Sequence, residues 1–555
     1  MYITKFLFTI KKTFFLRQFL FLFILFSSFK TEGQVNENYS FVNNYLYRMA
    51  QKGIINIQDY TLPLDRFEII KALESIKKSE SFLSITEKKE LIFLNQEYQS
   101  SININDTSIK PLLLRKDNVK RFRFFQFINK DAQLFIDPII GGSYSTYNNK
   151  NNIINYSGAR LYGNLGKKIG YNLLFRDITE RGDSVDFFKS FSPETGIFNT
   201  SRNPKQLNYS QLNFNIGYRW KNGMLSIGKD HLNWGYGKGG KIVLSSKAPS
   251  FPYIKLDYQP FKWLKFNYFN AWLNSNIIDS SRSYSTGTGV GNGFREVMRQ
   301  KYLAHHSISF IPIKGLEISI GESIIYSDKL EIGYLIPINF FKLYDQYASS
   351  FRINGGSNSQ LFAQISSRNQ LKNTHFYFNI FIDELRLSKI FDKTDSRNQL
   401  GYTVGINKTD FFLHYLTVGV EYTRINPFVY KNIIPAQTYE NASYSMGDWI
   451  GNNADRLYLF GEFTPFSRFK INVSYQSIRK GALGTLNQQY NQQPQPQFLF
   501  GPILKQVNVL FECSYEYLNR LNFFSRFGYL NRKFENPNFA NQSQRELSVG
   551  FSYGF

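Results

Sequence analysis

The sequence is poor in the residues that metal centres, disulfide bonds and nucleophilic catalysis require. Its 555 residues include one cysteine, Cys513, and five histidines. A single cysteine excludes a disulfide bond within the chain. Cys513 lies on the apolar side of an alternating segment, where we expect it to act as a small hydrophobic residue. No His-Glu-x-x-His metal pattern, Gly-x-Ser-x-Gly elbow or phosphate-cradling glycine loop occurs. We therefore expect no enzyme activity, no metal, no cofactor and no nucleic-acid partner.

Long hydrophobic runs are also missing beyond the N-terminal segment. No later stretch approaches the length of a membrane-spanning helix, about 20 apolar residues, and the mean hydropathy is −0.33. Residues 1–33 combine early lysines and the apolar run Phe19–Phe26 with the small residues Thr31 and Gly33. This pattern is typical of a cleaved signal peptide, so we expect residues 1–33 to direct export. An uncleaved membrane anchor is the alternative.

What the sequence has in excess is aromatic residues and positive charge. Phe, Tyr and Trp make up 17% of the chain, with 55 Phe and 37 Tyr, and the formal net charge is +24. Aromatic residues favour strands and membrane interfaces. The charge fits contact with acidic lipopolysaccharide or polysaccharide, although a general lysine bias of the source genome explains it equally well. The composition favours an exported, strand-rich protein.

From about Val119 the hydrophobic period changes to two, which is the pattern of strands. Between residues 212 and 220, large apolar residues alternate with Asn, Gly and Arg. The turn Lys221-Asn222-Gly223 follows, and the alternation then resumes. Asn-Gly between two alternating runs is a strong hairpin signal. The same pattern returns near residues 264–268, 316–320, 469–475 and 507–517.

The end of the chain indicates which kind of sheet residues 119–555 form. Apolar residues alternate with small or polar ones from Leu547 to Phe555, the final residue. A terminal aromatic on an amphipathic strand resembles the assembly signal of bacterial outer-membrane barrels. Short turns contrast with the long polar segments Asn274–Gln300 and Gly481–Gln497, which we expect to be extracellular. We predict an all-β transmembrane barrel of about 16–18 antiparallel strands in a bacterial outer membrane.

Residues 34–105 have the pattern of a small helical domain, in which apolar residues recur at intervals of three and four. Three short helices bury only a small core, so we expect them to lean on the periplasmic mouth of the barrel. Residues 106–118 are expected to be a linker. Two capping boxes, Asp65 with Glu68 and Ser84 with Glu87, predict the starts of two helices. An earlier helix is expected over Phe41–Gln51, ending at Gly53.

The most distinctive stretch runs from Gly228 to Pro252. It contains Asp230, the segment Trp234-Gly235-Tyr236-Gly237, the pair Leu244-Ser245, and Ala248-Pro249 before Phe251. Here the sequence resembles the Wzi family of outer-membrane capsule-assembly proteins and their relatives in gliding bacteria. That family has a W-G-x-G segment followed by a leucine-serine pair and an alanine-proline near an aromatic. The resemblance covers most of the mature chain through further motifs: Pro63-Leu64-Asp65-Arg66-Phe67-Glu68, Tyr334-Leu335-Ile336-Pro337, Ile382-Asp383-Glu384, Glu421-Tyr422-Thr423-Arg424, Gly447 and Gly451-Asn452.

The resemblance implies an outer-membrane barrel that binds or organises surface polysaccharide, capsular or extracellular, with the helices closing its periplasmic side. It implies outer-membrane lipids, lipopolysaccharide, the barrel assembly machinery and surface polysaccharide as partners. A cell-surface component of gliding motility is a second hypothesis within the same family. A diffusion porin or solute channel is a third, of a different class. A porin needs an open lumen, so the state of the lumen separates the first hypothesis from the third.

Two roles are open for the stretch around Trp234. In one, Trp234 and Tyr236 stack on sugar faces while Asp230 accepts hydrogen bonds from sugar hydroxyls. In the other, which we favour, the stretch folds into the lumen with Trp234 as its packing anchor. The structural motif would then comprise two glycines that tolerate positive φ and three further residues: Gly235, Gly237, Ser245, Ala248 and Pro249.

The histidines leave one catalytic alternative open. His305, His306 and Ser307 place a base next to a hydroxyl group, and His414 lies on another alternating segment. Some outer-membrane lipases build a serine and a histidine on a barrel wall. Neighbouring residues on a strand point to opposite faces, so His306 and Ser307 cannot form a dyad if this segment is a strand. An outer-membrane hydrolase therefore ranks last among the functions considered.

Overall fold

The computed structural model describes residues 36–37, 40–98, 109–117, 120–129, 131–287, 289, 293–351, 356–385, 392 and 398–554. The signal peptide expected over residues 1–33 and the assembly signal expected at Phe555 lie outside these residues. Within the described residues, no helix is long and apolar enough to cross a membrane. The described helices are all short: α2 (Ser40–Gln51), α3 (Arg66–Lys78), η1 (Glu80–Phe82), α4 (Ile85–Tyr98), η4 (Ile332–Leu335), α5 (Phe341–Phe351), η6 (Pro435–Gln437) and α6 (Leu486–Tyr490).

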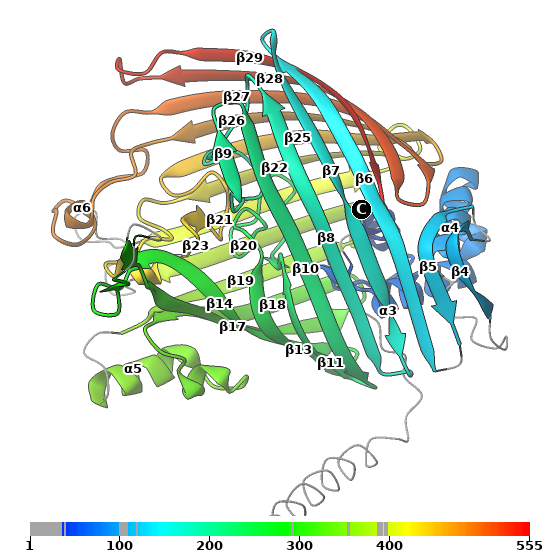
Figure 1. Cartoon of the computed structure of the whole chain (residues 1–555), viewed down its shortest axis with the longest axis horizontal. Coiled ribbons are helices and arrows are strands. Elements are labelled where there is room, and N and C mark those ends of the chain that lie inside the picture. The colour runs from blue at the N-terminus through cyan, green and yellow to red at the C-terminus, as the bar shows by residue number, and fades with distance from the viewer. Residues whose placement is uncertain are drawn as a thin grey trace, which may run out of the picture.

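In the described part of the chain, 18 antiparallel strands close into a barrel (Figure 1). Closure occurs where the last strand, β29 (Gln542–Tyr553), pairs with the first wall strand, β6 (Ala132–Tyr147). The predicted all-β barrel of about 16–18 strands is therefore confirmed. The other wall strands are β7 (Lys150–Leu165), β8 (Ile169–Gly182), β10 (Gln206–Trp220), β11 (Gly223–Asp230), β13 (Phe251–Phe261), β14 (Leu264–Ile278), β17 (Met298–Ile313), β18 (Leu316–Ser327), β19 (Asn358–Arg368), β20 (Thr374–Glu384), β21 (Gln399–Thr409), β22 (Leu416–Ile425), β25 (Ala454–Phe466), β26 (Phe469–Lys480), β27 (Leu504–Leu518) and β28 (Leu521–Phe534).

The outside of the wall is apolar. Alternate residues of the wall strands point outward, and many of these side chains are large, apolar and exposed. An apolar outer band with alternating inward polar residues is the pattern of a barrel that crosses a membrane. Exposed members of the band include Leu225, Ile227, Ile318, Ile320, Leu457, Leu459, Phe523, Phe527, Val549 and Phe551.

The two ends of the barrel differ in the length of their connections. At the short-turn end, tight hairpins join the strands. The predicted hairpin is one of them, because Trp220 pairs with Gly223 across the two residues Lys221 and Asn222. At the long-loop end, connections such as residues 231–250 and 426–453 join the strands. Both segments expected to be long loops lie at this end, although β14 and β17 take up the first and last residues of Asn274–Gln300.

The segment expected to be a linker, residues 106–118, contains a strand instead. β4 (Ile109–Lys116) pairs with β5 (Phe122–Ile128), and β5 pairs with the first residues of β6. The physical reason is that part of the edge of β6 has no other strand beside it. Because β29 pairs with β6 only from Ile140 onward, backbone groups of β6 before Ile140 form hydrogen bonds with β5 instead. The remaining short strands are β1 (Asn36–Glu37), β2 (Thr61–Leu62), β3 (Leu64–Asp65), β9 (Ser201–Asn203), β12 (Asn233–Trp234), β15 (Tyr284–Ser285), β16 (Phe294–Arg295), β23 (Glu440–Asn441) and β24 (Tyr444–Ser445).

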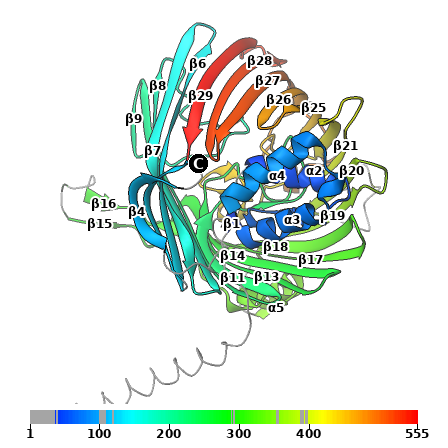
Figure 2. The same ribbon diagram turned by 90° about the vertical axis from the view of Figure 1, so that its right-hand side faces the viewer.

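The helices α2, α3 and α4 lie across the short-turn end of the barrel (Figure 2). At the start of α3, the Asp65 carboxylate accepts a hydrogen bond from the Phe67 amide. Glu68, the second member of the predicted capping box, instead lies 3.6 Å from the Arg219 guanidinium. Ser84 and Glu87 exchange both hydrogen bonds of a capping box at the start of α4. After α2 the chain turns at Gly53, whose φ is 71°.

Charged side chains dock this helical domain onto the barrel. The Arg48 guanidinium of α2 donates to Asp410 at 2.5 Å and to the Thr409 hydroxyl, both at the short-turn end. On α4, the buried Glu97 carboxylate accepts hydrogen bonds from Arg121 and Arg520. These partners lie far from one another in the sequence, so the docking depends on the closed barrel.

The buried carboxylate of Glu87 makes this docking sensitive to pH. Burial alone would raise the pKa of Glu87, but Arg48, Lys52 and the Ser84 amide outweigh burial and hold the pKa below its usual value. A carboxyl whose pKa is lower in the folded state stabilises the fold above its unfolded pKa, about 4.3. That stabilisation is lost as the pH falls toward the folded pKa.

We therefore expect the helical domain to become sensitive to protease as the pH falls below about 4.3. Glu87→Gln should make the domain more sensitive at neutral pH and should flatten its pH dependence in this range. Limited proteolysis of the purified barrel across a pH series measures both effects. Glu74→Gln, at an exposed position of α3, is the matched control. Equal pH profiles for Glu87→Gln and Glu74→Gln would contradict the role given to Glu87.

Candidate functional site

Two of the long connections fold into the lumen. We call residues 231–250, between β11 and β13, and residues 426–453, between β22 and β25, the plug. Their apolar side chains form one core with inward side chains of the wall. A diffusion porin keeps a water-filled lumen, so this packed core gives the porin hypothesis no support. The core includes Leu232, Trp234, Val243, Leu244, Val429, Tyr430, Tyr439, Met446, Trp449 and Ile450 of the plug, and Phe269, Leu303, Ile325, Phe362, Phe381 and Ile425 of the wall.

Three buried charges fasten the plug to the wall. Arg456 on β25 donates to Asp448 of the plug at 2.9 Å and to Glu421 on β22 at 3.2 Å. None of these three side chains has any exposed area. A buried charge that loses its partner is strongly unfavourable, so each member of the set depends on the others. We call Arg456, Asp448 and Glu421 the plug lock.

Glu421 also holds the backbone that follows the Trp-Gly-Tyr-Gly segment. Its carboxylate accepts hydrogen bonds from the amides of Lys238 at 2.7 Å and Gly239 at 3.2 Å. Just before them, Gly235 and Gly237 have φ values of 102° and 149°, which glycine adopts without strain. Two motifs that are far apart in the sequence therefore meet inside the lumen.

Trp234 is fully buried in the plug. Its ring packs against Phe269, His305 and Tyr60, with ring centroids 5.2, 4.4 and 6.3 Å away. The indole Nε1 donates to the Ser307 hydroxyl at 3.4 Å. In addition, β12 pairs with β2, so the plug and the segment after α2 are joined directly. Stacking on a sugar needs an exposed ring face, and Trp234 has none in this structure.

Asp230 and Tyr236 do not share a site. Asp230, at the end of β11, accepts hydrogen bonds from the Asn213 amide at 2.5 Å and from the backbone amide of His231 at 2.7 Å. Tyr236 exchanges two hydrogen bonds of 3.0 Å with the Asn379 side chain through its backbone. Tyr236 lines an internal chamber, whereas Asp230 does not. The structure therefore does not assemble the sugar site expected from Asp230, Trp234 and Tyr236 together.

The rest of the motif joins the two connections of the plug. The Ser245 hydroxyl donates to the Gly447 carbonyl at 2.6 Å. The Pro249 carbonyl accepts from the Asn441 amide at 3.0 Å, and Ala248 is buried in the plug core. These residues connect residues 231–250 to residues 426–453.

His305, His306 and Ser307 lie on β17, so their positions test whether His306 and Ser307 can form a catalytic dyad. Ser307 faces the lumen and lies 3.0 Å from the Tyr60 hydroxyl. His306 lies on the outside of the wall, where its Nε2 is 3.1 Å from the Glu322 carboxylate. His305 is buried next to Trp234. The structure therefore separates His306 from Ser307, and they form no dyad.

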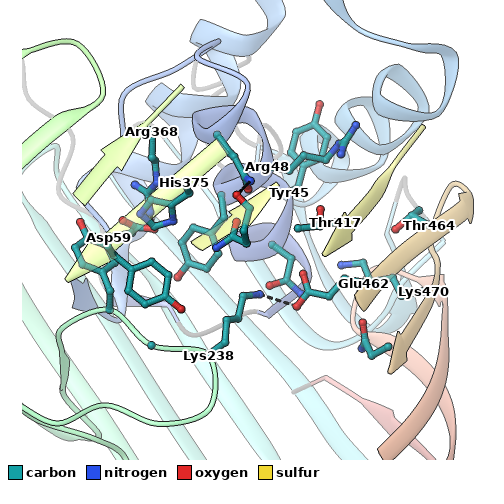
Figure 3. A pocket seen from close by; sticks show the side chains of 18 of the residues that line it. Tyr45, Arg48, Asp59, Lys238, Arg368, His375, Thr417, Glu462, Thr464 and Lys470 are labelled. Atoms are coloured by element: carbon teal, nitrogen blue, oxygen red, sulfur yellow. Dashed lines mark hydrogen bonds and ion pairs between the residues drawn. The ribbon is translucent and has the colours of Figure 1, made fainter. Parts of the chain in front are cut away.

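A chamber of about 270 Å³ lies between α2, the plug and the wall (Figure 3). We call it the lumen chamber. Its charged lining is mainly basic, and Figure 3 shows the Lys238 ammonium directed at the Glu462 carboxylate, 2.6 Å away. A space of this volume with charged groups in its lining has room for several water molecules or a small polar group. Its charged lining residues are Arg48, Lys238, Lys241, Arg368, Lys470, Asp59 and Glu462.

The chamber is held at its short-turn side by groups from the helical domain. Arg368 on β19 donates to Asp59 at 2.7 Å, which ties the segment after α2 to the wall. Tyr45 of α2 donates to the Glu87 carbonyl at 3.1 Å. Burial and the nearby Glu87 carboxylate raise the pKa of Tyr45 well above its usual value, so the phenol stays protonated. The ion pairs with Asp59 and Glu462 therefore hold the Arg368 and Lys238 cations in place in the chamber lining.

The sequence reasoning missed the residues that lock the plug. Glu421 appeared in a motif without a role, and Arg456 and Asp448 were not singled out. The available signal was a charged residue at an inward position of an alternating strand, as at Glu421 and Arg456. Such a charge inside a packed lumen needs a buried partner.

The closed wall, the apolar outer band, the packed plug and the capping helices define a plugged transmembrane β-barrel. The model of the family described as "Capsule assembly protein Wzi" matches residues 186–546, more than half of the chain. The chain therefore belongs to the Wzi capsule assembly family. Comparison with curated proteins gives no match.

Comparison with solved structures agrees on the fold. The chain is similar to Wzi from Escherichia coli, described as an outer membrane protein involved in group 1 capsule assembly and as a carbohydrate-binding β-barrel. The TM-score is 0.59 and the identity 14%, over 94% of this chain and 99% of that one. Pseudomonas aeruginosa OccK5 (OpdH) gives a TM-score of 0.41 and 10% identity, over 76% of this chain and 98% of the other. At 14% identity the likeness to Wzi concerns the fold alone.

Proposed function

We propose that this chain is an outer-membrane barrel that binds or organises surface polysaccharide at its long-loop end. The observation that carries the proposal is the plug, because a packed and locked lumen leaves the loop end as a fixed surface instead of a pore entrance. Membership of the Wzi capsule assembly family supports this choice over a porin. The likeness to a barrel described as carbohydrate-binding supports it as well. The proposed role needs no catalysis.

The proposed orientation places the helical domain in the periplasm and the long loops outside the cell. It is supported by the usual asymmetry of outer-membrane barrels, in which short turns face the periplasm. In this orientation Asn274–Gln300 and Gly481–Gln497 are extracellular. The barrel assembly machinery would insert the chain, and the +24 charge would favour contact with lipopolysaccharide and acidic polysaccharide.

Within the loop end, a second cavity is the better candidate for the sugar site. It has a volume of about 370 Å³ and lies at the rim, between the ends of β21 and β22 and the connection that follows β26. The Arg424 guanidinium lies 3.8 Å from the Phe498 ring centroid and donates to Asn426 at 3.1 Å. Amide side chains, an arginine and aromatic rings together can hydrogen-bond sugar hydroxyls and pack on sugar faces. We call this cavity the rim cleft; its lining is Asn398, Gln399, Arg424, Asn426, Pro427, Phe428, Gln495, Pro496, Gln497 and Phe498.

The connection that forms one side of the rim cleft is well supported. Thr485 and Gln488 form a complete capping box at α6. The Gln495 amide donates to the Gln489 carbonyl at 3.3 Å, and Asn453 accepts a hydrogen bond from the Leu499 amide at 2.7 Å. A preformed cleft loses less conformational entropy on binding than a flexible loop does. In this proposal the plug residues Trp234, Tyr236 and Asp230 contribute indirectly, by fixing the lumen beneath the loops.

We expect the double variant Arg424→Ala with Phe498→Ala to weaken polysaccharide binding by about thirty-fold. Arg424 and Phe498 pack on each other, so we treat them as one hot-spot contact, which contributes about 2 kcal/mol to the free energy of binding. A loss of about 2 kcal/mol corresponds to about thirty-fold in affinity. A glycan array probed with the purified barrel first identifies the sugar, and titration of each variant with that polysaccharide then gives the affinity. Arg479→Ala is the matched control, since Arg479 is an exposed arginine that does not line the cleft. Unchanged affinity in the double variant would remove the rim cleft from the proposal, and no binding by the wild type would overturn the function.

A further inference from the structure

The connection between β18 and β19 lies against the outside of the barrel wall. We call its residues 328–351, which contain η4 and α5, the outer cover. Figures 1 and 2 both place α5 outside the barrel, and α5 packs against β18. Tyr334 and Phe341 of the cover form one apolar cluster with Tyr268 and Ile324 of the outer wall. The Tyr268 hydroxyl also donates to the Tyr334 carbonyl at 2.9 Å.

Beneath the outer cover, the wall has two ionisable side chains on its outward face. Glu322 on β18 pairs in register with His306 on β17 and with Leu361 on β19, an exposed apolar residue. A carboxylate at this level would face hydrocarbon if nothing covered it, which is unfavourable in a membrane barrel. Glu322 is the central member of an outward series whose other members are apolar: Ile318, Ile320, Ile324 and Tyr326.

The outer cover satisfies both ionisable groups. The Glu322 carboxylate accepts hydrogen bonds from the backbone amides of Phe341 and Lys342, in the first turn of α5. The His306 Nδ1 lies 2.8 Å from the Pro337 carbonyl, and its ring stacks on Phe341 with centroids 4.3 Å apart. As a result Glu322 is only 1% exposed. These contacts fix the cover halfway down the outer face of β17 and β18.

The outward side of the outer cover is apolar. Along α5, Leu343, Tyr347 and Phe351 recur at every fourth residue and form an exposed stripe, while Lys342 and Gln346 lie beside it. An exposed apolar stripe with a polar flank is typical of a helix at a membrane surface. The part of the cover before α5 adds further exposed apolar residues, of which Ile338 is 85% exposed: Leu330, Ile332, Ile336, Ile338 and Phe340.

We propose that the outer cover is embedded in the outer leaflet of the membrane and contacts lipid acyl chains through its apolar side. The apolar side continues the band of β18, where Ile318 and Ile320 are exposed next to the covered Glu322. Because the cover reaches the middle of the wall, the lipid that surrounds the wall must meet the cover at the same level. The inference rests on the outer-membrane location and orientation proposed above, and it is independent of polysaccharide binding.

Site-specific quenching tests the proposal. An environment-sensitive dye is attached to single cysteines in a Cys513→Ser background, and each protein is reconstituted in phosphatidylcholine vesicles with nitroxide-labelled acyl chains. Ile338→Cys and Leu343→Cys probe the apolar side of the cover, and Lys342→Cys probes its polar flank. Val473→Cys is the control for the lipid-facing wall, and Gln492→Cys is the control for a loop in water.

We expect the dyes at positions 338 and 343 to be quenched at least half as strongly as the wall control. The dye at position 342 should be quenched less than the dye at position 343. Quenching at positions 338 and 343 no stronger than in the loop control would overturn the inference while leaving the barrel in the membrane. An unquenched wall control would instead overturn the membrane location itself. Heat-modifiable migration of each labelled protein checks that it is folded, and the exposed positions chosen should tolerate substitution.

Discussion

Replacing Arg456 with methionine is expected to lower the free energy of unfolding of the plugged barrel by about 3–5 kcal/mol. The variant removes the cation that lies between Asp448 and Glu421 and leaves both carboxylates buried without it. The two carboxylates would then repel each other or take up a proton, and the plug would lose the link between Asp448 and β25. We therefore also expect the lumen of Arg456→Met to open in a fraction of molecules.

Thermal unfolding in detergent micelles measures the loss of stability, and conductance in planar lipid bilayers measures the opening of the lumen. Arg299→Met is the matched control, because Arg299 makes an ion pair with Asp328 at 3.8 Å in which both side chains are exposed. An exposed ion pair contributes about 0–1 kcal/mol, so this control should melt close to the wild type. Equal melting temperatures for the two variants, with no added conductance in Arg456→Met, would contradict the plug lock.

Trp234→Ala is expected to keep the barrel wall folded while destabilising the plug by about 3–5 kcal/mol. The indole fills the space between Phe269, His305 and Tyr60, so its removal leaves a cavity at the centre of the plug core. It also removes the hydrogen bond to Ser307. Any loss of polysaccharide attachment should follow from this loss of stability, because the ring has no exposed face.

Melting behaviour and polysaccharide retention should be measured on the same variant. Trp263→Ala provides the control for losing a tryptophan, since Trp263 is half exposed at the short-turn end. The packing role predicts a lower melting temperature for Trp234→Ala and little change for Trp263→Ala. A Trp234→Ala protein with wild-type stability and impaired retention would favour the sugar-stacking role instead. Wild-type values in both measurements would exclude both roles.

The wall of the barrel could be predicted from the sequence because its signals are local. A strand that faces lipid on one side and a core on the other alternates along its own length, and a two-residue turn with Asn222 joins adjacent strands. The same holds for the helix caps at Asp65 and Ser84, where the interacting groups lie within three residues. The strand β4 was missed because its pairing depends on an edge of β6 that only the closed barrel creates.

The arrangement of the lumen could not be predicted in the same way. Whether Tyr236 faces solvent, a sugar or a protein core depends on β20, whose Asn379 and Tyr377 contact it from far along the chain. Glu421 is equally hard to assign, because an inward carboxylate on a strand suits a water-filled channel as well as a buried ion pair. Glu322 conflicts with the outward apolar pattern of β18, and only the position of α5 explains it.

The most direct test of the central claim is the distribution of surface polysaccharide between cells and medium. The bacterium that produces this protein is compared with a deletion strain, complemented with the wild type or with the double variant Arg424→Ala and Phe498→Ala. The proposed function predicts unchanged total polysaccharide, with a larger released fraction in the deletion strain. The wild type should restore attachment and the double variant should not. A deletion strain that retains its polysaccharide fully, but loses cell spreading, would contradict the account and favour a role in gliding motility.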